Sequence, residues 1–579
     1  MRARIDHLLR EALADFAVER GLEPALDPQL ERTRDPRHGD FTTNIALRLS
    51  RTLGQPPRVL AGAVAASIPE SDLIEAVDVA GPGFINLTVA PGAYRRELAT
   101  IIRTGPAYGC SDIGGGRRVL VEYVSANPTG PLHVGHGRNA AYGASVANLL
   151  RATGHDVHEE YYVNDAGRQM DILALSVWLR LLQLSGVALE LPANAYQGDY
   201  VRDIARAVRS AAGDGCPTLS QERLGELLAE PDAERCLDRL IAEAKQALGA
   251  DGFAALHNAA LTSILDDIKA DLAEFGVRPH RWYSEASLTD GGAIDRALQR
   301  LRERRLLDVR DGATWFRATA YGDEKDRVVV RENGATTYFA SDIAYHAEKR
   351  GRGFDLLLDV LGADHHGYVA RVRAGLEAMD ESGDCLEVRL VQFVTLYRGR
   401  ERVQMSTRTG EYVTLRELRA EVGNDAARFL YVSRSNDQHL DFDLELAKQQ
   451  SNDNPVYYVQ YAHARVSSLL RRMQEGGLGL ERTAAADLEC LTEEAEHGLL
   501  VLLSRYPEVV QLAAANRAPQ HLVQYLRSLS ASFHAYYNAH RVLVEDETLR
   551  NARVTLSLAT QQVIRNGLAL LGVTAPESM

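Results

Sequence analysis

Two short apolar runs, each followed by a longer helical segment, constrain the fold of this chain most strongly. The run "VLVEYVS", which begins at residue 119, is typical of a buried strand, and "RNAAYGASVANLLRATGH" follows it after a Pro/Gly turn with the pattern of a helix. The segments "DVHEEYYV" and "NDAGRQMDILALSVWLRLLQL" repeat this order. Strands that alternate with helices predict a parallel sheet covered by helices, which is an α/β fold.

The remaining sequence divides into further regions, since 579 residues are too many for one core. The first part ends in the strand pair "VAGPGFINLTVAPGAY" and a Gly-rich connector, so we expect an N-terminal α+β domain at residues 1–110. We expect the α/β domain at residues 111–400, with a helical insertion at about 185–285. Further strands are expected at "DRVVVRE", "TTYFASD", "LLLDVLGAD" and "VRLVQFVTLY". We expect a short connecting region at 401–450 and an all-α region at 451–579.

Charge and cysteine content narrow the possible partners. The chain has 65 basic and 79 acidic residues and a formal net charge of −14, which argues against bulk coating of nucleic acid but allows a local basic groove. Its five cysteines are odd in number and never spaced as CxxC, so we expect reduced thiols in a cytoplasmic protein and no structural zinc site. No run of about 18 apolar residues occurs, so we expect no membrane partner.

The stretch "PLHVGHGR" lies between the first strand and the helix that follows it. In that place His133 and His136 can donate hydrogen bonds to phosphate oxygens, and Gly135 lets a nucleotide approach the backbone. A pair of histidines with this spacing can equally bind a metal or lie on the surface. The position at the start of a helix favours a nucleotide site.

Several blocks of sequence then resemble one family. The string "HVGH" resembles the HIGH signature of class I aminoacyl-tRNA synthetases, and "SANPTGPLHVGHGR" resembles its arginyl-tRNA synthetase version. The blocks "GDEKDRVVVRENGATTYFASDIAYH", "GADHHGY", "VQMSTRTGEYVTL", "NPVYYVQYAHAR" and "LGVTAPESM" follow in the order of that family. They cover the chain from about residue 38 to its last residue, and together they are more specific than any one block.

The resemblance implies an arginine–tRNA ligase. Such an enzyme joins L-arginine to ATP as arginyl-adenylate and then transfers arginine to the 3′ terminal ribose of its tRNA. It implies a Rossmann-like catalytic domain, an N-terminal domain that contacts the corner of the tRNA, a signature-loop and stem-contact region at 401–450 and an all-α anticodon-binding bundle at 451–579. ATP with Mg²⁺, the tRNA for arginine and L-arginine are the expected ligands, and we expect a monomer.

The second family signature, a KMSKS loop, is altered in this chain. The letters "QMSTR" stand at its place, so both lysines are absent and Arg408 is the nearest cation. A guanidinium can bridge two phosphate oxygens, so we expect Arg408 to stabilise the phosphates. His133, His136 and Arg408 are the expected catalytic residues, and together they are expected to supply positive charge. We expect Gly135, Met405 and Ser406 to complete the ATP site with them. The alternative is that Arg408 only caps a surface loop.

Carboxylates are expected to select the amino acid, because a planar acceptor binds a guanidinium best. The resemblance places the guanidinium on Glu122, Tyr338 and Asp342, and the α-amino and carboxylate end on Asn127 and Asp364. The alternatives are that Asp342 caps a helix and that Tyr338 packs in the core as a strand residue.

Contacts with tRNA are expected at both ends of the chain. In "HGDFTTNIALRLS", Phe41 is expected to stack on an unpaired base and Asn44 to read its edge, although a simple turn before a helix explains this segment equally well. In the helical tail, "VYYVQYAHAR" interleaves aromatic and polar side chains, and half of its tyrosines are expected in the core. The proposed contacts there are Tyr457, Tyr458, Gln460, Tyr461, His463 and Arg465.

Two other functions compete with this interpretation. One is an adenylating enzyme that does not use tRNA, and the other is a relative that binds RNA without catalysis. The long helical tail argues against the first, while intact "HVGH", Glu122, Tyr338 and Asp342 argue against the second. The resemblance also implies that arginine activation depends on bound tRNA, and the absence of both signature lysines offers a physical cause for this dependence.

Overall fold

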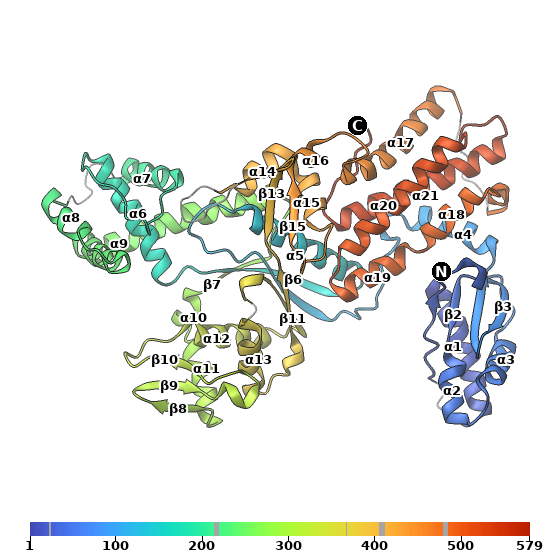
Figure 1. Ribbon diagram of the computed structural model, residues 1–579, viewed down its shortest axis with the longest axis horizontal. Helices are drawn as coiled ribbons and strands as arrows, with labels where there is room; N and C mark the ends of the chain where they lie inside the picture. The colour runs from blue at the N-terminus through green and yellow to red at the C-terminus, as the bar shows by residue number, and fades with distance from the viewer. Residues whose placement is uncertain (23–24, 213–218, 366, 404–411, 479–484) are drawn as a thin grey trace.

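The regions of the chain lie along one long axis (Figure 1). The computed structural model describes all residues except 23–24, 213–218, 366, 404–411 and 479–484. A parallel sheet lies in the middle, a helical insertion projects to one side, and the C-terminal helices extend to the other side, where they adjoin the N-terminal domain. Within the described parts, no helix is both long and apolar enough to cross a membrane.

A five-stranded parallel sheet with the order β12-β11-β5-β6-β7 forms the centre of the molecule and confirms the predicted α/β fold class. Its inner strands are largely buried, which explains why they read as short apolar runs. Helix α5 begins at the carboxyl end of β5, where ligands bind in folds of this kind. The elements are β5 (Arg118–Glu122), α5 (Val134–Ala152), β6 (Asp156–Val163), β7 (Arg281–Ser284), β11 (Leu356–Gly362) and β12 (Leu386–Val391).

The helical insertion follows β6. It begins with α6, whose apolar side chains are almost all buried, and the next helices pack on it. The predicted insertion reached to about residue 285, but "RWYS" is strand β7, because a four-residue strand shows too little alternation to be recognised. The helices are α6 (Arg168–Leu184), α7 (Asp199–Ala212), α8 (Gln221–Leu228) and α9 (Ala233–Glu274).

A second, smaller insertion lies between β7 and β11 and has its own apolar core. It contains an antiparallel sheet with the order β10-β9-β8 and several helices. The elements are α10 (Ala286–Asp290), α11 (Ala293–Glu303), β8 (Leu307–Arg310), β9 (Ala313–Phe316), β10 (Arg327–Val330) and α12 (Tyr338–Gly351).

Helix α12 corrects one prediction. We expected "TTYFASD" to be a strand and considered Asp342 as a helix cap, but the helix already begins at Tyr338 and its N-cap is Thr337. Tyr338 and Asp342 are therefore four residues apart on one helix, which places both side chains on the same face.

The sequence after β11 continues the catalytic region and leads to the C-terminal helices. A second small sheet has the order β14-β13-β15. The elements are α13 (Tyr368–Ala378), β13 (Val394–Arg398), β14 (Glu401–Arg402), α14 (Leu415–Val422), α15 (Asn424–Tyr431), β15 (Leu440–Asp443) and α16 (Leu444–Lys448). Short 3-10 turns occur at Pro36–His38, Gly105–Ala107, Ala318–Tyr321, Ala363–His365, Gly383–Cys385 and Ala485–Cys490.

The N-terminal domain is α+β, as predicted. Its antiparallel sheet has the order β1-β2-β4-β3, and helices with apolar inner faces cover it. The segment "VAGPGFINLTVAPGAY" supplies the hairpin of β3 and β4, which confirms the predicted strand pair. The elements are α1 (Arg2–Glu19), β1 (Glu31–Arg32), β2 (Phe41–Thr43), α2 (Ile45–Leu53), α3 (Pro57–Ser67), β3 (Ile74–Ala80), β4 (Phe84–Val89) and α4 (Pro91–Thr104).

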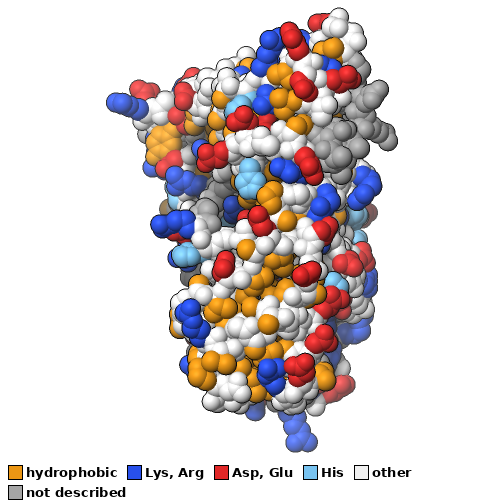
Figure 2. Space-filling view, turned by 90° about the vertical axis from the view of Figure 1, so that its right-hand side faces the viewer, with side chains coloured by type: hydrophobic (Ala, Val, Ile, Leu, Met, Phe, Trp, Pro, Cys, Tyr) orange, Lys and Arg blue, Asp and Glu red, His pale blue; other side chains and the backbone are white. Residues whose placement is uncertain are grey.

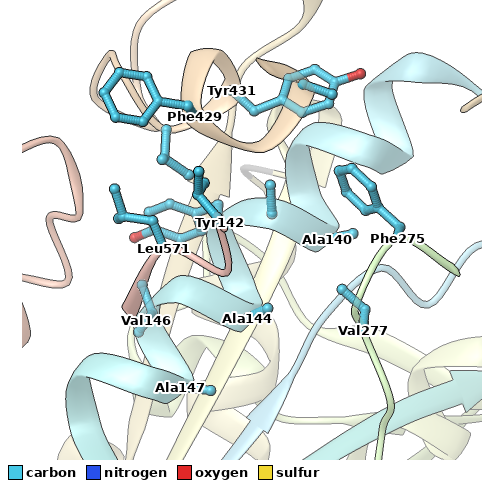
Figure 3. Packing of buried hydrophobic residues seen from close by; sticks show 14 of the residues in the cluster. Ala140, Tyr142, Ala144, Val146, Ala147, Phe275, Val277, Phe429, Tyr431 and Leu571 are labelled. Atoms are coloured by element: carbon cyan, nitrogen blue, oxygen red, sulfur yellow. The ribbon is translucent and has the colours of Figure 1, made fainter. Parts of the chain in front are cut away.

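The C-terminal helices pack against the rest of the chain at two places. Figure 3 shows buried side chains of α5 next to Phe429 of α15, Phe275 at the end of the insertion and Leu571, the residue that follows the last helix. The buried Arg428 guanidinium joins these segments, because it donates to the carbonyls of Phe275 at 2.8 Å and Leu571 at 3.0 Å. The helices are α17 (Pro455–Glu475), α18 (Glu494–Ser504), α19 (Tyr506–Asn516), α20 (Gln520–Ala539) and α21 (Glu547–Leu570).

The second contact joins the N-terminal domain to α19. Arg32 forms an ion pair of 2.7 Å with Glu508, and the rings of Tyr108 and Tyr506 stack with centroids 6.0 Å apart. Figure 2 shows this end of the molecule, with acidic and basic side chains interspersed and hydrophobic side chains gathered on its lower half, over the N-terminal domain.

Candidate active site

The two histidines of "HVGH" meet at the first turn of α5. His133 is the N-cap, and its Nδ1 accepts hydrogen bonds from the backbone N–H groups of Gly135 at 3.1 Å and His136 at 3.4 Å. Nδ1 of His136 accepts from the N–H of His133 at 3.2 Å, and the two rings stack with centroids 3.6 Å apart. Both Nδ1 atoms are acceptors, so each neutral ring carries its hydrogen on Nε2.

These histidines therefore provide hydrogen bonds and no charge. Burial lowers the pKa of both rings below the ordinary histidine value, and for His136 well below it. We expected them to supply positive charge, but the helix start that positions the rings also buries them, which disfavours the charged form. Their Nε2–H groups can still donate to a phosphate oxygen. Gly135 is needed beside them, since a Cβ there would lie 2.9 Å from the His133 ring.

A pocket of about 520 Å³ opens next to these rings. One wall comes from the turn before α5, and the other comes from the helical insertion, which the sequence had not linked to this site. The hydroxyl of Tyr200 donates to the carbonyl of Thr129 at 2.7 Å, and the hydroxyl of Tyr412 donates to the carbonyl of Pro131 at 3.4 Å. The pocket is lined by Asn127, Thr129, Gly130, Pro131, His133, His136, Ala195, Tyr196, Gln197, Gly198, Asp199, Tyr200, Tyr412, Thr414 and Glu417.

A second group of side chains collects around the first turns of α12. Tyr338 is exposed, and the Asp342 carboxylate accepts a hydrogen bond from the hydroxyl of Tyr368. Burial raises the pKa of Asp342 to about 6. Glu285, just after β7, faces the same region, and burial together with the charges of Asp342 and Asp165 raises its pKa to about 7, against a hydrogen bond from Tyr162.

Glu285 was missed by sequence reasoning, because no local motif surrounds it. It connects to the predicted site through Asn164. In the amide orientation that satisfies its neighbours, Asn164 donates to Glu285 Oε2 at 2.8 Å and its oxygen lies 3.3 Å from Oδ1 of Asn127. The structure thus brings Asn127 and the carboxylates near α12 into one region. Asp364 is exposed at the carboxyl end of β11, beside His365 at 3.6 Å.

Glu122 lies in this region but is already engaged. Its Oε2 accepts hydrogen bonds from Lys349 Nζ at 2.6 Å and from the hydroxyl of Tyr345 at 2.8 Å, and its Oε1 accepts from Ser125 Oγ at 3.0 Å. Only 6% of the residue is exposed. We expected Glu122 to bind the guanidinium directly, but its buried carboxylate already has a cation, so this expectation is not supported.

The expected RNA contacts in the N-terminal domain need a correction. Phe41 is fully buried in β2, with the Arg32 guanidinium 4.5 Å above its ring, so it is not free to stack on a base. Asn44 is the N-cap residue of α2 and its Oδ1 is buried. The exposed aromatic side chain of this sheet is Phe84, at the start of β4, with 38% of its surface accessible. Strand alternation alone did not reveal which phenylalanine faces solvent.

The expected contacts on α17 divide into two groups. Gln460 and His463 are buried and bind the end of the chain, where Gln460 donates to the Thr574 carbonyl at 2.9 Å and His463 Nδ1 donates to the Pro576 carbonyl at 2.8 Å. We therefore withdraw these two as RNA contacts.

The others remain partly exposed on one side of the helix. They are Tyr457, Tyr458, Tyr461 and Arg465. Tyr457 and Tyr461 stack with centroids 6.2 Å apart, and the Arg465 guanidinium lies 4.9 Å above the Tyr461 ring. We call these four residues the α17 strip.

The altered second signature lies outside the described residues. This applies to Gln404, Met405, Ser406, Thr407 and Arg408, whose roles stay predictions from the sequence. Among the residues that are described, no group of three His, Cys, Asp or Glu side chains is placed to hold a metal ion.

Comparison with known proteins covers the whole chain. Residues 3–89 match the arginyl tRNA synthetase N terminal domain, residues 100–205 and 273–462 match the catalytic domain of tRNA synthetases class I (R), and residues 459–579 match the DALR anticodon binding domain. The segment between the two catalytic matches belongs to the helical insertion.

Individual relatives agree with these matches. An arginine–tRNA ligase of Thioalkalivibrio sulfidiphilus is 55% identical over 100% of both chains. One of Coxiella burnetii is 51% identical, also over 100% of both chains. The solved arginyl-tRNA synthetase of Thermus thermophilus is 25% identical, covers 100% of both chains and superimposes with a TM-score of 0.74.

Proposed function

This chain belongs to the arginyl-tRNA synthetase family of class I and acts as an arginine–tRNA ligase, and on that premise we propose which residues carry out its two reaction steps. The observation that carries the proposal is the presence of two neutral histidines at the start of α5 together with a group of buried carboxyl side chains, Asp342 and Glu285, around the start of α12. The first group suits ATP phosphates, and the second suits a guanidinium.

In the first step the arginine carboxylate attacks the α-phosphate of ATP and pyrophosphate leaves. We assign to His133 and His136 the donation of Nε2–H hydrogen bonds to the phosphate oxygens as the α-phosphate becomes pentacoordinate. Such donors are already in place and need no reorganisation, which is how preorganised dipoles stabilise a transition state. Arg408 is proposed to add positive charge, and the roles of Met405 and Ser406 follow from the signature alone.

Asp342 and Glu285 are proposed to hold the guanidinium, with Tyr338 beside them. Their carboxyl groups have raised pKa values mainly because they are buried, and an arriving guanidinium supplies a positive charge next to them. Asn127 and Asp364 are proposed to hold the α-amino and carboxylate end. Glu122 acts indirectly, through the residues that it positions.

In the second step a hydroxyl of the terminal ribose of tRNA attacks the carbonyl carbon of arginyl-adenylate, the arginyl ester forms and AMP leaves. We propose that the α17 strip contacts the anticodon region, because aromatic rings stack on unpaired bases while arginine contacts phosphate. At the other end, Phe84 replaces Phe41 as the proposed stacking residue.

The remaining assignments also stay proposals. Mg²⁺ commonly binds substrate phosphates together with one or two carboxylates, so we propose that it enters with ATP. We further propose a cytoplasmic monomer whose arginine activation depends on bound tRNA.

Arginine-dependent exchange of pyrophosphate into ATP tests this proposal. It should require L-arginine, should not proceed with citrulline, a neutral analogue of the same length, and should rise strongly on addition of the cognate tRNA. Exchange that does not need tRNA at all would support the adenylating enzyme without tRNA. Binding of tRNA with no exchange under any condition would support the non-catalytic relative.

A further inference from the structure

Three buried carboxylates form a row across the central sheet. Asp359 of β11 pairs in register with Glu122 of β5, and Glu122 pairs with Glu160 of β6. Neighbouring strands lie about 4.8 Å apart, so like charges in such a row repel strongly unless they are neutralised. The row lies near the carboxyl ends of the strands, directly beneath α12.

Basic side chains at the end of α12 contact these carboxylates. Lys349 Nζ lies 2.6 Å from Glu122 Oε2 and 2.8 Å from Asp359 Oδ1, and it is fully buried. Arg352 binds both oxygens of Glu160, at 2.5 Å and 2.8 Å. The hydroxyl of Tyr345 lies 2.8 Å from both Glu122 and Glu160.

His346 provides a further contact to Asp359. Its Nδ1 lies 2.8 Å from the carbonyl oxygen of Asp342, which can only accept, so Nδ1 carries a hydrogen. Its Nε2 lies 2.8 Å from the carboxylate of Asp359, and although burial alone would raise the pKa of Asp359, Lys349 and His346 hold it below the usual range. Basic side chains thus contact all three carboxylates of the row.

Such a buried network needs an explanation beyond stability. Replacing buried ion pairs by apolar side chains of similar volume is often neutral or stabilising, so their energy alone does not account for this arrangement. Lys349 differs from the other basic side chains because it contacts Glu122. Glu122 in turn binds Ser125, which lies in the loop after β5, residues 124–127. We call these four residues the substrate loop.

The substrate loop after β5, residues 124–127, is strained. Val124 has a φ of 68° and Ser125 a φ of 38°, both in the left-handed region that non-glycine residues rarely adopt, and that is least favourable for a β-branched residue. Conformations of this kind persist only where neighbours hold them. Here the Val124 N–H donates to Asn139 Oδ1 at 2.7 Å, and the Ala126 carbonyl accepts from the Tyr161 hydroxyl at 2.8 Å.

Ser125 is held by Glu122. Its Oγ donates to Glu122 Oε1 at 3.0 Å and accepts from the N–H of Tyr162 at 3.0 Å. Lys349 therefore connects, through Glu122 and Ser125, to the loop that carries Asn127. The same helix carries Tyr338 and Asp342 at its other end.

We infer that Lys349 is a positioning residue that fixes the spacing between the two ends of the amino-acid site. One end is the carboxylate group on α12, and the other is Asn127 on the strained loop. Lys349 fixes the distance between them through Glu122 and Ser125. A substrate that binds both ends should therefore lose affinity when Lys349 is replaced, whereas a ligand that binds only the guanidinium end should not. This inference rests on the proposed function.

The experiment compares L-arginine with n-butylguanidine, which keeps the guanidinium and the four-carbon chain but lacks the α-amino and carboxylate groups. The Michaelis constant of arginine and the inhibition constant of n-butylguanidine are measured in pyrophosphate exchange with tRNA present. Lys349→Met should raise the arginine constant by about tenfold or more and change the n-butylguanidine constant by less than about threefold.

Ser125→Ala tests the same connection at a second place, so the inference can still be tested if Lys349→Met does not fold. Ser125 is small and only partly buried, so the variant should fold and should show the same separation between the two ligands. Arg352→Met is the matched control, because it removes a buried cation of the same helix region that contacts Glu160 and not Glu122. It should leave the ratio of the two constants within about threefold of the parent ratio.

Two results would overturn the inference. One is an arginine constant that Ser125→Ala leaves within about threefold of the parent, and the other is an equal weakening of both ligands by Lys349→Met. Equal weakening would mean that Lys349 acts only on the guanidinium end. If the unmodified enzyme shows no arginine-dependent exchange, the proposed function itself fails. The two results above would instead overturn only the role of Lys349.

Discussion

Acidification from about pH 8 to about pH 6 should weaken arginine binding. The guanidinium pocket contains two carboxyl groups with raised pKa values, about 6 for Asp342 and about 7 for Glu285, mainly because both are buried. A protonated carboxyl group cannot form an ion pair with a guanidinium. Binding therefore requires loss of these protons, so affinity must increase as the pH rises through this window and level off above it.

The size of the effect follows from the ionised fractions. At about pH 6, about one half of Asp342 and about one tenth of Glu285 are ionised, whereas at about pH 8 nearly all of Asp342 and about nine tenths of Glu285 are. If arginine needs both carboxylates, its affinity should fall about twentyfold over this range. If it needs only Asp342, the fall should be about twofold.

Isothermal titration of the enzyme with L-arginine at three pH values and constant ionic strength measures this directly. Glu285→Gln provides the control, because it removes the group with the higher pKa and should reduce the pH dependence to about twofold. Affinity that is equal at about pH 6 and about pH 8, or higher at the lower pH, would refute the assignment of these carboxyl groups to the guanidinium.

Three further predictions concern single side chains. Asp342→Asn should weaken arginine by about 2–4 kcal/mol and leave the Michaelis constant of ATP nearly unchanged, and an arginine constant within about threefold of the parent would contradict the assignment. Arg408→Ala should slow adenylate formation about a hundredfold in single-turnover measurements with little change in arginine affinity, whereas an unchanged rate would assign the charge to another group. Phe84→Ala should raise the Michaelis constant of tRNA without lowering the melting temperature. Phe41→Ala should instead destabilise the protein by about 3–5 kcal/mol, and the reverse pattern would restore Phe41 as the RNA contact.

The parts of the site that could be predicted from the sequence depend on residues and elements that lie near one another along the chain. The histidines of "HVGH" lie at the start of a helix because a strand, a turn and a helix succeed one another within about 30 residues. Tyr338 and Asp342 share a face because they are four residues apart, although their helix was expected to be a strand. The segment "TTYFASD" has two aromatic residues and two threonines, which favour strands, but a helix forms there and buries Ala340, Ile343 and Ala344 in the core of the second insertion.

The parts that could not be predicted depend on contacts between distant segments. Lys349 meets Glu122 across 227 residues, and Tyr200 meets Thr129 across 71. Neither contact leaves a pattern in one sequence, because each requires knowing which strands are neighbours and where an insertion folds back. The exchange of Phe41 for Phe84 has a similar cause, since both lie at the start of a strand and only the packing of the sheet decides which ring is covered.

The neutral histidines give a physical reason for the proposed dependence on tRNA. No lysine or arginine is present among the described residues that line the pocket beside α5, while the carboxylates of Asp199 and Glu417 are. ATP therefore brings several negative charges to a wall that offers hydrogen bonds and repulsion but no fixed positive charge. Arg408 is the candidate cation, and the sequence leads from it through Tyr412 to α14. Helix α14 contacts α15, which in turn contacts α17, the first of the helices that are proposed to bind the anticodon. Energy from RNA binding that places Arg408 next to the phosphates would raise the rate of adenylate formation without any change in the binding site for L-arginine.

Consequently tRNA should increase the exchange rate about a hundredfold in the parent enzyme and far less in Arg408→Ala, while the affinity of the two enzymes for L-arginine stays alike. Equal stimulation of both enzymes would show that the RNA acts through a different group.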